Sequence, residues 1–190
     1  MRDGRVHAAA VEGQGGGSVA MTPEEEVRAT REVIERMEWA LGANSDDMAA
    51  HFHEDFRWRG NRGCGTKDGL AAFRANWQLP LRAAFTERTY HTQRFVVEGA
   101  WASCFGHIEA THSGPFMGIA PTGRRVTIPY MDFWRVEDGR IADNWVSVDF
   151  PHVLAQLGRD VFAGEGWEAY DRGERTPPRP DATSSKGANA

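Results

Sequence analysis

Apolar side chains recur every three or four positions between residues 22 and 42, and this period predicts an amphipathic helix. Thr22, Pro23 and Glu25 supply an N-cap, a proline in the first turn and a capping-box glutamate, and Gly42 ends the helix. The predicted core face consists of Val27, Ile34, Met37 and Leu41. The predicted solvent face consists of Glu24, Arg28, Arg31, Glu35 and Glu38.

A second helical period extends from residue 67 to residue 85, and Pro80 is placed to kink or interrupt it. Its apolar positions are Leu70, Phe73, Trp77, Leu81 and Ala84. A shorter helix is expected over residues 45–52, where polar capping residues precede Met48 and Phe52.

Alternation of apolar and polar positions predicts strands in the rest of the chain. Residues 56–59 alternate with Phe56 and Trp58 on one face. Longer strands are expected at residues 88–97, 100–112, 124–136 and 140–148. This order of elements predicts an α+β fold, in which helices pack on one face of a curved antiparallel sheet.

The strand at residues 100–112 has two contrasting faces. One face is small and mostly apolar, and it consists of Ala102, Cys104, Gly106, Ile108, Ala110 and His112. Because small side chains leave room beneath a concave sheet, we expect a cavity on this side, with His112 at its end. The opposite face carries Trp101, Phe105, His107 and Thr111. An apolar outer face of this kind predicts a homodimer that forms through the sheet.

The last hairpin decides which further residues face the cavity, because a slip of one residue exchanges the two faces of a strand. A two-residue turn at Asp138-Gly139 would direct to the cavity Trp145, Ser147 and Asp149. A three-residue turn with a glycine bulge would direct there instead Asn144, Val146 and Val148. We favour the bulge, and we interpret Asp149 as the N-cap of a short helix that begins at Phe150.

The length of 190 residues fits one domain, which we place at residues 21–170. Residues 1–20 are rich in glycine and lack a hydrophobic period, and residues 171–190 are prolyl and polar, so both segments are expected to be disordered. Met21 stands directly before the first helix, and we expect the natural protein to begin there.

Composition excludes several classes of function. The net charge is −5 and no basic stripe is present, which argues against nucleic acid as a partner. No apolar run approaches the roughly 18 residues of a membrane span. Cys64 and Cys104 lack the spacing of a disulfide framework or a zinc site, so we expect no metal and a cytoplasmic setting.

Asp132 is the main candidate for chemistry, because it interrupts the apolar strand at residues 126–134. A carboxylate in such a strand is costly unless it is paired or faces a water-filled pocket. One interpretation is a buried aspartate that is paired with an arginine or a tyrosine hydroxyl. The other, which we favour, is a general acid/base whose pKa is raised by apolar walls.

His112 is the second catalytic candidate, since the unperturbed pKa of histidine lies near neutral pH. A structural, hydrogen-bonded role is the alternative for this side chain. An aromatic pocket wall is expected from Tyr130, Trp58, Trp77 and Trp134, and substrate contacts are expected from Asn144 and Val146.

Four motifs carry a family resemblance, and they are Thr111–Gly114, Gly118–Arg125, Arg135–Ile141 and Gln156–Gly158. With them, residues 24–158 resemble the SnoaL-like polyketide cyclase, or ester cyclase, family. The resemblance implies the cone-shaped nuclear transport factor 2-like fold, with a pocket between the sheet and the first helices. It also implies a catalytic aspartate seven residues after the hairpin glycine, where this chain has Val146, and a histidine on the preceding strand, where it has Asp132.

Together these features predict a cofactor-free enzyme of lyase or isomerase type that acts on an apolar or ring-containing carbonyl compound. Cyclase, isomerase and dehydratase or hydratase reactions are all compatible with this prediction. One rival is a non-catalytic module that binds a small ligand, because a fold does not fix a function. Another rival is an epoxide-type hydrolase in which an aspartate activates water.

Overall fold

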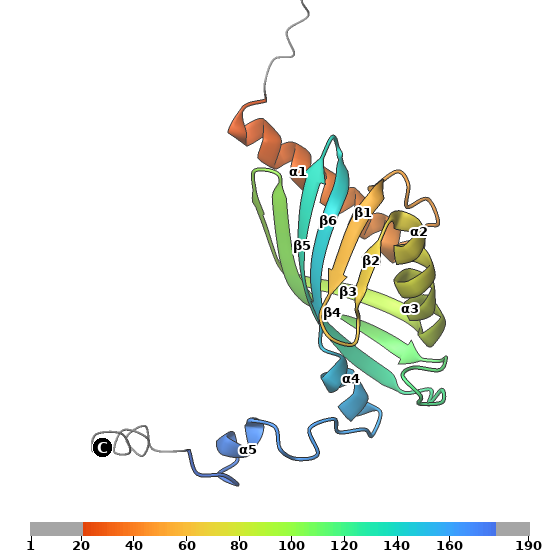
Figure 1. The fold of residues 1–190 in the computed structure, drawn as a ribbon, viewed down its shortest axis with the longest axis vertical. Coiled ribbons are helices and arrows are strands. Elements are labelled where there is room, and N and C mark those ends of the chain that lie inside the picture. The colour runs from red at the N-terminus through yellow and green to blue at the C-terminus, as the bar shows by residue number, and fades with distance from the viewer. Residues whose placement is uncertain (1–20, 178–190) are drawn as a thin grey trace, which may run out of the picture.

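A computed structural model describes residues 21–177 of the chain. The ribbon in Figure 1 shows one strongly curved sheet with α1, α2 and α3 lying along it. The elements of the first half are α1 (Pro23–Gly42), β1 (Phe52–Gly60), β2 (Thr66–Asp68), α2 (Leu70–Phe73), the π-helical turn η1 (Arg74–Gln78) and α3 (Leu79–Ala84). The elements of the second half are β3 (Phe85–Glu98), β4 (Trp101–His112), β5 (Arg125–Glu137), β6 (Arg140–Val148), α4 (Phe150–Gln156) and α5 (Glu168–Asp171).

The predicted α+β fold is confirmed. The predictions of disorder for residues 1–20, and for residues 178–190 of the C-terminal tail, lie outside the described part of the chain. The remaining tail residues, 171–177, are described and follow directly on α5.

Helix α1 begins at the predicted capping box. The backbone N–H of Glu25 donates to Thr22 Oγ1 at 3.2 Å, and the backbone N–H of Thr22 donates to Glu25 Oε2 at 2.9 Å. Ile34 and Met37 are buried on its inner face, where the helix packs against β3 and β4. The cap fixes where the helix starts, and the apolar face fixes which side closes the concave surface of the sheet.

The second helical segment is interrupted at the proline, as the sequence predicts. The π-helical turn η1 ends at Gln78, and Pro80 lies in the first turn of α3, because proline cannot donate the backbone hydrogen bond that a continuous helix needs. The helix predicted at residues 45–52 is wrong. Ser45 instead accepts a hydrogen bond from the backbone of Asp47, and Phe52 already belongs to β1.

The sheet has the strand order β2-β1-β6-β5-β4-β3. Strands β3 to β6 form the expected antiparallel meander, and the predicted faces of β4 alternate as expected between exposed and buried residues. The exception is β1, which pairs with β6 in parallel, so the sheet is mixed. The chain segment between these two strands is long enough to make the crossover that a parallel pair requires.

The last hairpin contains an extra residue, but not in its turn. Glu137 pairs with Arg140, and Asp138 and Gly139 both have positive φ, which defines a two-residue type I′ turn. The predicted glycine bulge at the turn is therefore wrong. The register shifts one step further along, between Arg135 and Val136, so Ala142 becomes the extra residue of β6.

This displaced bulge still produces the favoured register. Asp132 pairs directly with Val146, and Asn144 and Val148 are buried on the same side of β6. Asp149 caps α4, because its side chain accepts a hydrogen bond from the backbone N–H of His152 at 3.0 Å. The predictions that Val146 shares the cavity face with Asp132 and that Asp149 is a helix N-cap are thus confirmed.

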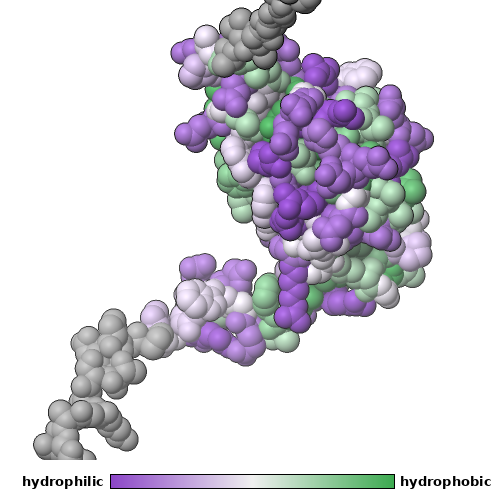
Figure 2. Space-filling view, turned by 45° about the horizontal axis from the view of Figure 1, so that its top comes forward, coloured by the Kyte–Doolittle hydropathy of each residue, from purple (hydrophilic) through white to green (hydrophobic). Residues whose placement is uncertain are grey.

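Figure 2 shows the segment that carries α5 standing apart from the main body of the molecule. Val161, Phe162 and Trp167 are exposed on this segment. Among residues 21–177, no helix combines the length and apolar composition needed to cross a membrane.

Candidate active site

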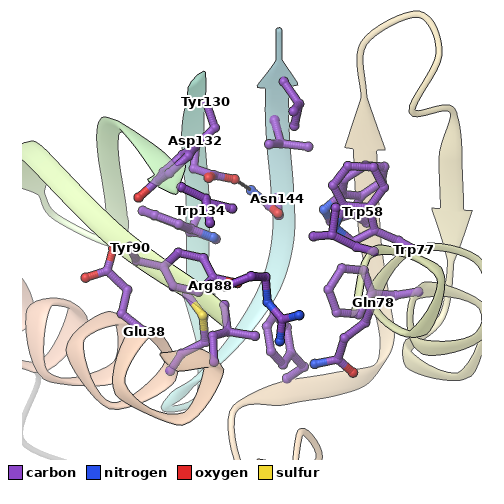
Figure 3. A pocket seen from close by; sticks show the side chains of 18 of the residues that line it. Glu38, Trp58, Trp77, Gln78, Arg88, Tyr90, Tyr130, Asp132, Trp134 and Asn144 are labelled. Atoms are coloured by element: carbon purple, nitrogen blue, oxygen red, sulfur yellow. Dashed lines mark hydrogen bonds between the residues drawn. The ribbon is translucent and has the colours of Figure 1, made fainter. Parts of the chain in front are cut away.

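A cavity of about 370 Å³ lies between the concave face of the sheet and the helices. Its size falls within the range of small-molecule sites. The close-up in Figure 3 shows side chains from both sides converging on it. Every residue predicted to contact substrate lines this cavity, namely Trp58, Trp77, Tyr130, Trp134, Asn144 and Val146. Trp58 and Trp77 contact one another with ring centroids 4.4 Å apart and form an aromatic wall.

Asp132 also lines the cavity and is held by Asn144 from the neighbouring strand. The Asn144 amide donates to Asp132 Oδ1 at 2.9 Å and to the carbonyl of Phe133 at 3.1 Å, which fixes the amide and hence the carboxyl group. Desolvation raises the pKa of Asp132 to about 7, and the nearby Glu38 adds to the rise, whereas the Asn144 hydrogen bond opposes it. No cation contributes to this pKa. The carboxyl group can therefore gain or lose a proton near neutral pH.

Glu38 is a second carboxyl group in the cavity, and sequence reasoning missed it by assigning it to the solvent face of α1. Burial raises its pKa, against a hydrogen bond from Thr92 that lowers it. Thr92 Oγ1 donates to Glu38 Oε1 at 3.4 Å and lies 3.3 Å from the Tyr130 hydroxyl. Glu38 lies next to Met37 at the edge of the apolar face of the helix, and this position is the feature of the sequence that could have indicated its place in the cavity.

Tyr130 completes this polar group. Since the single Thr92 hydroxyl proton is directed to Glu38, the Tyr130 hydroxyl serves as the donor to Thr92. Burial is the main cause that raises the pKa of Tyr130 above its usual value, so the phenol stays protonated and can donate a hydrogen bond. Asp132 and Tyr130 project from the same face of β5.

His112 does not border the cavity, which differs from the prediction. It is fully buried near Phe85 and Phe116, with ring centroids at 5.6 Å and 6.4 Å. Its Nδ1 atom lies 3.0 Å from Thr122 Oγ1. The inward face of β4 was predicted correctly, but His112 is its last residue and reaches a separate part of the core.

Potential metal ligands among residues 21–177 gather on the outer face of the sheet instead of in the cavity. His91, His107 and Glu109 place one ligand atom each within 4.8 Å of one another. The two imidazole rings stack at 4.7 Å, and Glu109 also contacts Arg125 at 3.5 Å. Sequence spacing could not reveal this group, because His91 lies on β3 and the other two ligands lie on β4.

Comparison with known proteins identifies the family. The model of the SnoaL-like polyketide cyclase family matches residues 25–157, which is more than half of the chain. The chain belongs to the SnoaL-like polyketide cyclase family.

Named relatives and solved structures agree with this family. Nogalonic acid methyl ester cyclase from Streptomyces nogalater is 29% identical over 126 residues, which are 65% of this chain and 92% of the relative. Aklanonic acid methyl ester cyclase from Streptomyces peucetius is 28% identical over 88 residues, which are 46% of this chain and 61% of the relative. The structure of IdmH from Streptomyces antibioticus superposes with a TM-score of 0.60 at 25% identity, covering 68% of this chain and 99% of IdmH.

A SnoaL-like polyketide cyclase from Agrobacterium tumefaciens shares the fold, with a TM-score of 0.57 at 18% identity over 68% of this chain and 98% of that protein. The expected SnoaL-like fold and the expected cyclase-like enzyme class are thus confirmed. The cavity lies between the sheet and the first helices, which is where the family resemblance implies the pocket.

Proposed function

We propose that this chain catalyses a cofactor-free ring closure of a carbonyl compound, with Asp132 as the group that exchanges a proton with the substrate. One observation carries the proposal: a carboxyl group with a pKa of about 7 faces an aromatic cavity, and among residues 21–177 no cation contributes to that pKa. A positioned acid or base works best when its pKa lies near the working pH.

The position of Asp132 also fits the arrangement of catalytic residues that the family resemblance implies. The resemblance implies a catalytic aspartate at the position of Val146, and Val146 is the direct cross-strand partner of Asp132. Side chains at directly paired positions on one face lie side by side. This pairing supports a carboxylate that serves the same part of the cavity from the neighbouring strand.

The proposed mechanism begins with removal of a proton from a carbon next to a carbonyl group by the Asp132 carboxylate. Asn144 holds the carboxylate in one orientation. The protonated Tyr130 hydroxyl turns its proton from Thr92 to the substrate and polarises the carbonyl oxygen. The resulting carbon nucleophile attacks a second carbonyl of the same molecule, and the proton that Asp132 received is returned to the new alkoxide. Atoms balance without a cofactor, because substrate and product are isomers.

The substrate class follows from the walls and from the relatives. Trp58, Trp77 and Trp134 favour a flat, apolar ring system. Two relatives are named for methyl esters of nogalonic and aklanonic acid. We therefore propose a polyketide-like, ring-containing carbonyl compound as the substrate.

The two rival functions receive less support. An arginine held between two carboxylates would favour the epoxide-type hydrolase. Arg88 forms hydrogen bonds with the Phe85 carbonyl and the Asn44 side chain, not with Asp132 or Glu38. A binding module would be favoured by an Asp132 that a fixed arginine neutralises, and no cation contributes to its pKa.

The test uses the purified protein with nogalonic acid methyl ester and with aklanonic acid methyl ester, without added cofactor. Chromatography with mass detection should show a product that is isomeric with the substrate. The Asp132→Asn variant is the control and should form no product. Turnover at the wild-type rate in this variant contradicts the proposal.

We propose further that the protein forms a homodimer through the outer face of the sheet. The exposed apolar side chains of this face are Trp101, Phe105, Met131, Phe133 and Trp145. They lie on adjacent strands, since Phe105 pairs with Met131 and Phe133 pairs with Trp145. Light scattering should give twice the chain mass for the wild type, and Phe133→Glu should shift it toward the monomer. A monomeric wild type at micromolar concentration contradicts the dimer.

The cytoplasmic location of the protein stays a prediction.

A further inference from the structure

Gln78 and Arg88 line the same cavity with polar atoms that no described residue satisfies. Gln78 is 4% exposed, yet neither its amide nitrogen nor its amide oxygen has a hydrogen-bond partner. The buried Nε of Arg88 also lacks a partner among residues 21–177. Native proteins rarely leave such groups unpaired, because burial removes their hydrogen bonds to water without replacement. These atoms therefore indicate a ligand.

The charge of Arg88 points to the kind of ligand. Its two terminal nitrogens donate to the carbonyl of Phe85 and to the side chain of Asn44, and both acceptors are neutral. Arg82 borders the same cavity but is paired with Asp46 at 3.1 Å. Within residues 21–177 no carboxylate pairs with Arg88, so its positive charge is open to a ligand, and its neutral acceptors hold the guanidinium in place.

The two side chains come from different elements and share one part of the cavity. Gln78 ends the π-helical turn η1, and Arg88 lies near the start of β3. Figure 3 shows both in the lower part of the view, whereas Asp132 and Asn144 lie in the upper part. The cavity therefore has a second polar site besides the one at Asp132.

We propose that Gln78 and Arg88 bind an anionic, conjugated oxygen of the substrate, either a carboxylate or an enolate. Arg88 Nε and the Gln78 amide nitrogen donate to this oxygen, and charge strengthens both hydrogen bonds. The Gln78 amide oxygen accepts a hydrogen bond from a neighbouring hydroxyl group of the substrate. The inference rests on the proposed function, in that it places one end of the substrate while Asp132 acts on another part of it.

The test measures binding of simple probes by calorimetry at about pH 6, where Asp132 is mostly protonated and the cavity is less negative. 2-Naphthoate represents a carboxylate, and 2-hydroxy-1,4-naphthoquinone, which is ionised at this pH, represents an enolate. Methyl 2-naphthoate and 2-methoxy-1,4-naphthoquinone are their neutral counterparts. The wild type should bind at least one anion about tenfold or more tightly than its neutral counterpart. Equal affinities within both pairs overturn the proposal.

Two substitutions assign the preference to these residues. Arg88→Met should weaken binding of the preferred anion by about 10- to 100-fold, and Gln78→Met should weaken it by about 3- to 10-fold. The matched control is Arg82→Met, which removes an equal charge from an arginine that is already paired with Asp46, and it should change the affinity less than twofold. An anion preference that persists in both Arg88→Met and Gln78→Met overturns the proposal.

Melting temperature separates a binding role from a structural one. Gln78→Met replaces an unpaired buried amide by an apolar side chain of similar size, so the melting temperature should stay level or rise. A lowered melting temperature with unchanged probe binding would show a structural amide and overturn the inference. Asp132→Asn distinguishes the two proposals, because it should retain probe binding whether or not Asp132 carries the reaction.

Discussion

Two aspartates on opposite faces of the same sheet have opposite environments. Asp132 on β5 faces the cavity, and its direct cross-strand neighbours are Cys104 and Val146. Asp143 on β6 faces outward, and its direct neighbours are Arg135 and Arg57. The same carboxyl group therefore has apolar neighbours at one position and cationic neighbours at the other.

The contrast appears in the pKa values. Burial raises the pKa of Asp132 to about 7. Burial would also raise that of Asp143, but hydrogen bonds from Arg135 at 2.7 Å and the contact with Arg57 at 2.9 Å outweigh it and hold the pKa below the ordinary value. Asp143 stays charged and structural, whereas Asp132 is free to exchange a proton. Burial raises both pKa values, and the arginines beside Asp143 reverse this rise at one aspartate only, which leaves Asp132 as the group that can act as a catalyst.

The largest expected effect is loss of turnover in Asp132→Asn. The amide has nearly the same shape but cannot exchange a proton, and a positioned acid or base contributes about 10²–10⁴-fold in rate. Initial rates and thermal melting measured on the same preparation check this. The contrast between the two aspartates fails if Asp132→Asn keeps full activity, or if it loses activity only because it unfolds.

The matched change, Asp143→Asn, should lower stability and leave turnover nearly unchanged. It removes the charge that holds three arginines, at a cost of about 1–3 kcal/mol in the free energy of unfolding. The cost is smaller than for a fully buried ion pair, because the arginine side chains are 29–50% exposed and can be hydrated. Urea unfolding measures the loss, and turnover per folded molecule should stay within a few-fold of wild type.

The pH dependence of stability should separate the two sites by sign. The folded pKa of Asp132, about 7, exceeds its reference value of 3.8, so folding favours the protonated form and stability is lost as pH rises through this window. Asp132→Asn should therefore gain stability over wild type as pH rises from about 4 to 8. The lowered pKa of Asp143 gives stability that is present above pH 3.8 and is lost as pH falls through the folded pKa. Melting curves for both variants, measured from below pH 3.8 up to pH 8, test the opposite slopes.

The smallest effects concern the groups that tune Asp132. Turnover should rise with pH and level off above about 7, because the base must be ionised. Glu38→Gln removes a neighbouring negative charge and should move this rise to lower pH, whereas Asn144→Val removes a hydrogen bond to the carboxylate and should move it to higher pH. Shifts in the same direction would contradict the roles assigned to these neighbours.

The sequence reveals one of these aspartates more readily than the other. Asp132 interrupts a run of apolar residues, so its cost in an ordinary strand is visible without a structure. Asp143 is followed by polar Asn144. Its partner Arg135 depends on the bulge in the last hairpin, and its partner Arg57 is recognisable only once β1 is known to join β6 in parallel. Alternation within a strand can be predicted, but pairing across a long connection depends on the whole sheet.

The same limit explains the other differences at the site. Trp58, Trp77 and Tyr130 line the cavity as predicted, because strand alternation and helical spacing determine which face each occupies. Glu38 and Gln78 were missed, since polar side chains at the edge of an apolar face give no signal until a second element covers them. His112 follows the alternation of β4, yet the curvature of the sheet carries the strand end beyond the cavity.

The extra residue at Ala142 has an evolutionary consequence. Without this one residue the ladder would run unbroken from Glu137 and Arg140, and Asp143 would still lie opposite Arg135. Asn144 and Val146 would therefore keep their places in the cavity. In such a hairpin, one residue can be gained or lost at the bulge without exchanging the row of side chains that faces the active site.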